Sequence, residues 1–161
     1  MLIQMSTAPN ELTPCSHTGC VLSAETGGSA CVLHVARAGK SRDELAAAFQ
    51  QLDAANIIRI RDLDLRDADL SGIFLELKNL QHSDLTGANF DNARMTKVGF
   101  DFSTLDGAHF ENAILEKVDL RRVKSMRGCH WYEAIFDGVQ VPTMEHVGLA
   151  TPYDFGTKAE N

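Results

Sequence analysis

The feature that most constrains this chain is a strict five-residue repeat. One position in each five-residue unit holds a large apolar side chain. The position two residues before it mostly holds a small or β-branched one, and Lys78 is the clear exception. A period of five fits neither an amphipathic helix nor a simple alternating strand. The repeated positions are all large and apolar: Ile60, Leu65, Leu70, Leu75, Leu80, Leu85, Phe90, Met95, Phe100, Leu105, Phe110, Leu115 and Leu120.

Two inward side chains in every five residues predict a chain that turns a corner at each repeat. Four such sides close a square coil of about 20 residues, and stacked coils pair like parallel strands at roughly 4.8 Å per layer. The sequence therefore predicts an all-β solenoid of about four coils, on the order of 20 Å tall.

The individual repeats carry the pattern A(D/N)LXX, most clearly at residues 68–72, 83–87 and 88–92. In this the chain resembles the pentapeptide-repeat family. The resemblance covers residues 58–141 and implies a right-handed quadrilateral β-helix. It also implies a binding or scaffold role, because members of the family are mostly of that kind.

The segments on either side of the repeat are suited to covering the ends of a stack. Within residues 41–57, Ser41 and Glu44 form a capping-box pattern, which predicts an amphipathic helix over 42–55 lying on the first coil. Residues 142–161 are either a second cap or a tail. Beyond Leu120 the repeat shifts by one residue, which predicts a bulge within 123–126.

Residues 1–40 hold a cluster of candidate metal ligands: Cys15, Cys20, Cys31 and His34. Three thiolates and an imidazole form a common structural zinc set, and a short segment with little core gains folding energy from metal. We expect a small zinc knuckle with a structural Zn²⁺. His17 is a competing ligand, and unrelated thiols or a disulfide are the alternatives. A zinc knuckle joined to a repeat solenoid is similar to an arrangement found in some pentapeptide-repeat proteins.

Two groups of outward residues are candidate partner-binding positions. Phe74, Leu77 and Ile114 are apolar where polar residues are expected, and they would dock either the protein's own N-terminal segment or a separate partner. A distortion of that coil is the other explanation. The second group is cationic, and is either an anion-binding or partner-binding protrusion or a solvated loop: Arg121, Arg122, Lys124 and Arg127.

Composition excludes several classes of function. No apolar run reaches the roughly 20 residues that span a bilayer, which disfavours a membrane protein. The net charge of −7 disfavours a general nucleic-acid binder, because phosphate contacts need clustered cations. The N-terminus resembles no secretory signal, so we expect a cytoplasmic protein. The common nucleotide-binding, hydrolase and metalloprotease motifs are missing from the sequence, which favours a non-enzymatic chain.

The expected function is therefore a protein–protein interaction or scaffold module, whose partner the sequence does not name. One alternative is DNA mimicry toward a topoisomerase such as gyrase, but residues 58–141 hold 14 acidic and 11 basic residues, a modest excess. Another is nucleic-acid binding through the zinc knuckle with Arg37, Lys40 and Arg42. The chain is expected to be a monomer or an end-to-end homodimer.

Overall fold

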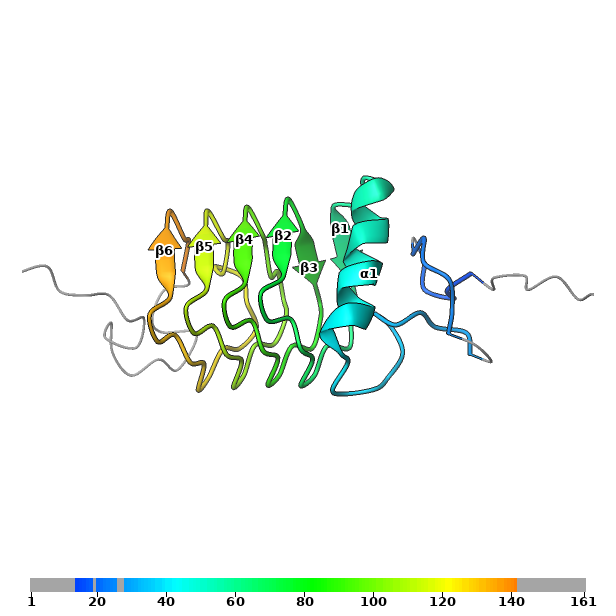
Figure 1. Cartoon of the computed structure of the whole chain (residues 1–161), viewed down its shortest axis with the longest axis horizontal. Coiled ribbons are helices and arrows are strands. Elements are labelled where there is room, and N and C mark those ends of the chain that lie inside the picture. The colour runs from blue at the N-terminus through cyan, green and yellow to red at the C-terminus, as the bar shows by residue number, and fades with distance from the viewer. Residues whose placement is uncertain (1–13, 19, 26–27, 142–161) are drawn as a thin grey trace, which may run out of the picture.

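A computed structural model describes residues 14–18, 20–25 and 28–141, and it is a β-solenoid with one helix at its N-terminal end (Figure 1). Two parallel sheets run along it. One joins β1 (Arg59–Arg61) to β3 (Asn79–Gln81). The other joins β2 (Phe74–Glu76), β4 (Arg94–Thr96), β5 (Ile114–Glu116) and β6 (Ile135–Asp137) in that order. The expected quadrilateral β-helix of about four coils is confirmed.

The solenoid has four faces, which we number in chain order. The first contains β1 and β3 and continues through Gly99, Asp119 and Gln140. The second is the ladder Asp64, Asp84, Thr104, Ser125, and the third is the ladder Asp69, Asn89, His109, His130. The fourth contains β2, β4, β5 and β6.

The interior is filled by the side chains of the five-residue repeat. All thirteen repeated apolar residues are buried, and the small residues before them, such as Ala88 and Ala108, are buried too. Aromatic rings stack between coils, with Phe110 lying 4.9 Å from Phe90 and 4.2 Å from Trp131 between ring centroids. A packed axis of this kind positions the outward residues rigidly.

The one-residue shift near the end of the repeat is a bulge, as predicted. Partners lie 20 residues apart up to the pair Gly99 and Asp119, and 21 apart from Thr104 and Ser125 onward. Val123 and Met126 are both buried, whereas Lys124 between them is exposed. The extra residue therefore projects from the second face, and the last coil keeps its stacking.

Lys78 is accommodated without distortion of its coil. Strand β2 pairs with β4 in regular register on one side of it, and Asn79 pairs with Gly99 on the other. The Lys78 side chain is buried, and its Nζ lies 2.5 Å from Oδ1 of Asp53. The alternative of a distorted coil is thus wrong: this lysine reaches the helix above it.

Helix α1 (Arg42–Ala54) covers the start of the solenoid (Figure 1). Its N-terminus forms the predicted capping box between Ser41 and Glu44. Its apolar face consists of Leu45, Ala48, Phe49 and Leu52, which are buried in the same core as the first coil. The predicted end at residue 55 is one residue beyond the observed end.

A loop that precedes α1 pairs with the remaining edge of the first coil. The carbonyl of Leu33 accepts the N–H of Asp64 at 3.1 Å, and the carbonyl of Lys40 accepts the N–H of Asp69 at 2.8 Å. These bonds satisfy backbone donors that an open solenoid end would leave unpaired. Residues 142–161, predicted to be a cap or a tail, lie outside the described residues.

In the described part of the chain, the helix is too short and too polar to cross a membrane.

Candidate metal centre

The first two predicted ligands lie on a tight turn. Pro14 and Ser23 form an antiparallel bridge, and the N–H of Cys15 donates to the carbonyl of Leu22 at 3.0 Å. The N–H of Cys20 donates to the carbonyl of His17 at 3.1 Å. The turn brings Cys15 and Cys20 to the same side, as a Cys-x4-Cys knuckle requires.

The other two ligands lie on a single turn nearer the solenoid. The carbonyl of Cys31 accepts the backbone N–H groups of His34 and Val35 at 2.9 and 2.8 Å. This turn places the thiol of Cys31 and the imidazole of His34 on one side, and both residues are buried.

The four side chains converge, with all ligand atoms within 4.8 Å of one another. The Sγ atoms of Cys20 and Cys31 are 3.7 Å apart, and Nδ1 of His34 lies 3.2 Å from Sγ of Cys31 and 3.5 Å from Sγ of Cys15. A tetrahedral zinc ion would separate two sulfurs by about 3.8 Å and a sulfur from a nitrogen by about 3.5 Å. These donors can hold a metal ion without rearrangement of the backbone.

A second hydrogen bond orients the imidazole of His34. Its Nε2 lies 3.0 Å from the carbonyl oxygen of Arg61, which accepts only. The proton therefore sits on Nε2, and Nδ1 keeps its lone pair for a ligand. Metal-bound histidines in proteins are commonly fixed in this way.

The environment affects the protonation of each donor. Burial raises the pKa of the Cys31 thiol to about 12 and raises the pKa of Cys20. Burial acts in the same direction on Cys15, but backbone N–H groups, including that of Cys31, lower its pKa overall. Burial lowers the pKa of His34, which keeps the imidazole neutral. Metal binding would release the thiol protons that burial otherwise retains.

The alternatives to a four-ligand metal site fit less well. The ring of His17 stacks on that of His34 with a centroid distance of 4.0 Å, and its Nδ1 is 3.9 Å from Sγ of Cys15. It packs beside the site and is not a member of the converging set. All four cysteines among the described residues are free, so no disulfide joins them.

The centre is tied to the rest of the protein by charged groups. Arg37 pairs with Glu25 at 3.2 Å and with Glu44 of α1 at 2.8 Å. Lys40 is fully buried, and its Nζ donates to the carbonyls of Val35 and Asp64. In the alternative of nucleic-acid binding, Lys40 cannot be one of the cations, because its buried ammonium cannot contact a phosphate.

The predicted apolar residues lie on or beside the fourth face. Phe74 and Ile114 occupy one column of this face with Arg94 between them, as the register of β2, β4 and β5 requires. Leu77 lies at the neighbouring corner. Ile135 continues the column, because β6 pairs with β5 across the bulge. It is not among the residues singled out from the sequence, and the shifted repeat is the signal that would identify it.

Three of the predicted cationic residues lie around the second face, opposite the fourth, whereas Arg121 borders the first face. Arg121 pairs with Asp119 at 2.7 Å, and the guanidinium of Arg122 lies 4.5 Å above the ring of Phe102. Lys124 is the bulged residue and Arg127 is at the next corner. One member of each group shares a surface, because Leu77 and Arg121 both line a hollow along the first face. The other predicted residues do not line it.

The fold and the buried Cys/His set define a class: a β-solenoid of about four coils with a cap that can hold a metal ion. Within the solenoid, residues 64–101 match the family model described as Pentapeptide repeats, in eight copies.

No curated protein matches the chain. Among solved structures, the chain is similar to a pentapeptide repeat protein, Rfr23, from the cyanobacterium Cyanothece 51142, with 25% identity and a TM-score of 0.47. The match covers 52% of this chain and 56% of that one.

Proposed function

We propose that this protein is a non-enzymatic interaction module whose partner binds the fourth face of the solenoid. The observation that carries the proposal is one outward column of that face, in which Phe74, Ile114 and Ile135 are apolar and Arg94 is the one charged member. Phe74 and Ile135 are 56% and 57% exposed, and Ile114 lies between them in the column. Apolar side chains gathered on a rigid surface are typical of docking sites.

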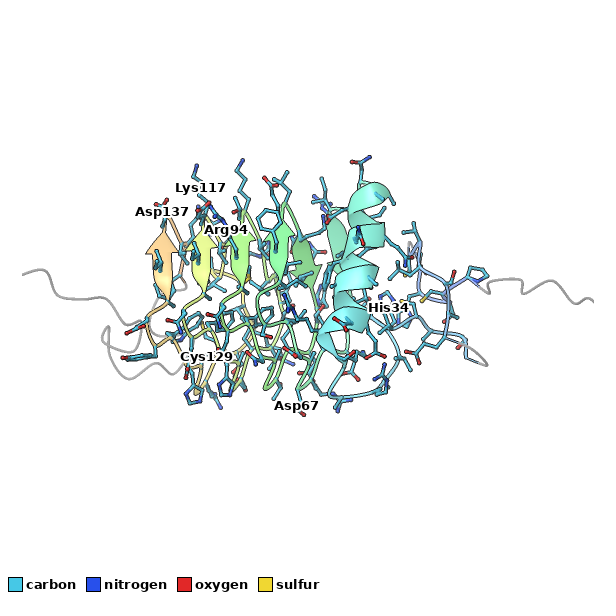
Figure 2. All side chains as sticks on the ribbon, viewed as in Figure 1. His34, Asp67, Arg94, Lys117, Cys129 and Asp137 are labelled. Atoms are coloured by element: carbon cyan, nitrogen blue, oxygen red, sulfur yellow. The ribbon has the colours of Figure 1, made fainter. Side chains whose placement is uncertain are left out.

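Charged side chains lie within and beside this column and would orient a partner. The second outward column of the same face is Glu76, Thr96, Glu116 and Asp137. Arg94 pairs with Glu116 at 2.9 Å. Figure 2 shows Arg94, Lys117 and Asp137 on the same side of the solenoid. Mixed charge around an apolar centre favours a protein partner over a nucleic acid, which requires clustered cations.

The experiment uses three forms of the full chain as bait for affinity capture from a lysate of the native host, and the bound proteins are identified by mass spectrometry. One is the unchanged protein, one is the double variant Phe74→Glu and Ile135→Glu, and the matched control is the double variant Arg122→Ala and Lys124→Ala on the opposite side. We expect a stoichiometric partner with the unchanged protein and with the control, and its loss with the fourth-face variant. A partner lost only with the control would place binding on the cationic side and refute the proposal.

We also propose that the metal in the cap is Zn²⁺ and that its role is structural. Three thiolates with one imidazole match zinc better than a hard cation such as magnesium, and four protein ligands leave no position for a reacting water. Elemental analysis of purified protein is expected to give one zinc per chain, and Cys31→Ser to abolish it. Full-length protein that is folded and free of metal would refute this assignment.

A further inference from the structure

The third face ends in two histidines that are neighbours across the last two coils. Its ladder runs Asp69, Asn89, His109 and His130, so adjacent members are one strand spacing apart. The imidazoles of His109 and His130 stack with a centroid distance of 4.5 Å and an angle of 13° between the rings. This pairing depends on the bulge, since a strict 20-residue spacing would place Cys129 beside His109.

A carboxylate completes the group. Glu111 follows His109 by two residues, and its backbone N–H donates to Oδ1 of Asp91 at 2.8 Å, which fixes the backbone there. One ligand atom from each of His109, Glu111 and His130 lies within 4.8 Å of the others. His130 is exposed, and the other two side chains are half-buried, so an ion can approach from solvent.

This donor set has a definite chemical preference. Two imidazole nitrogens with one carboxylate oxygen suit borderline divalent ions such as Zn²⁺, Ni²⁺ and Cu²⁺, whereas Mg²⁺ and Ca²⁺ prefer oxygen alone. Two nitrogens on one tetrahedral ion are about 3.3 Å apart. The side chains therefore need to close by up to about 1.5 Å, which rotation of surface rings provides without movement of the ladder.

We propose that His109, Glu111 and His130 form a second binding site for a divalent transition-metal ion, on the surface of the last two coils. It is separate from the Cys/His centre, which lies beyond the opposite end of the solenoid (Figure 1). With three protein ligands, the ion keeps a coordination position for water or for a donor atom of another molecule. The site binds reversibly from solvent, unlike the buried centre in the cap.

The test is a Ni²⁺ titration of the full chain by calorimetry, with histidine signals followed by NMR. Three proteins are compared: the unchanged chain, His130→Ala, and the matched control His82→Ala, which removes a surface histidine from a different corner. We expect His130→Ala to bind one ion fewer per chain than the unchanged protein, and His82→Ala to bind the same number. This difference does not depend on how many ions the cap binds.

Local readouts separate metal binding from general damage to the fold. Paramagnetic Ni²⁺ is expected to broaden the ring signals of His109 and His130 and to leave that of His82 sharp. Glu111→Gln keeps both imidazoles and is expected to weaken the site by at least about tenfold. Equal stoichiometry in the unchanged protein and His130→Ala, or equal broadening of all three rings, would overturn the proposal and leave the stacked pair a packing feature.

Discussion

Phe110 offers the sharpest test of the filled solenoid axis. Its ring is fully buried and lies between Phe90 and Trp131, at centroid distances of 4.9 and 4.2 Å. Replacing it with alanine removes the middle of an aromatic stack and leaves a cavity that neighbouring coils cannot close, because their backbones are held by ladders on four faces. The same substitution at Phe102, which is 44% exposed at a corner, is the matched control.

Phe110→Ala is expected to lower the free energy of unfolding by about 3–5 kcal/mol, the usual cost of replacing a buried Phe or Trp with Ala. For a chain of this size, that corresponds to a fall in melting temperature of about 6–20 °C. Phe102→Ala loses a cation–π contact with Arg122 and some half-buried surface, for about 1 kcal/mol. Both variants are measured by urea unfolding and by thermal melting. Equal losses in the two would refute the packed-axis account.

Two further predictions concern the helical cap. Hydrogen bonds from the hydroxyl and N–H of Ser41, and from Arg37, lower the pKa of Glu44 to about 2. Since the unfolded pKa is about 4.3, this stabilisation is present above that pH and is lost as the pH falls toward 2, and Glu44→Gln is expected to flatten the loss in urea midpoints measured at pH 7 and pH 3. Asp53→Ala leaves the buried ammonium of Lys78 without its carboxylate and is expected to destabilise the fold by about 1–3 kcal/mol. Lys78→Met removes the buried charge itself and is expected to cost less. A lower urea midpoint for Lys78→Met than for Asp53→Ala would contradict the assigned pair.

The solenoid could be predicted from sequence because one local rule repeats. Each repeat places one large and one small side chain inward, so thirteen apolar residues in phase leave little choice of architecture. Helix α1 was equally accessible, since Ser41, Glu44 and the apolar spacing that follows are local signals. The four ligands of the cap could be proposed from residue type and spacing alone.

Features that depend on pairing between coils could not be predicted from the sequence in the same way. The loop of residues 33–40 pairs with the first coil through its backbone, which leaves no pattern in side chains. Lysine is usually a surface residue, but two backbone carbonyls hold the ammonium of Lys40 in the interior. His109 and His130 become neighbours only once the extra residue is placed at Lys124, and a shift of repeat predicts its region but not its side-chain consequences.

The central claim of the metal assignment is that an ion bound in the Cys/His centre would hold the loop of residues 33–40 on the first coil. Amide hydrogen exchange of the full chain, before and after removal of metal by a chelator, tests it directly. The N–H groups of Asp64 and Asp69 donate to backbone carbonyls of this loop. Those of Asp84 and Asn89 donate to carbonyls within the solenoid. We predict that chelation speeds exchange at Asp64 and Asp69 and leaves Asp84 and Asn89 protected. Unchanged protection at all four amides would contradict the account.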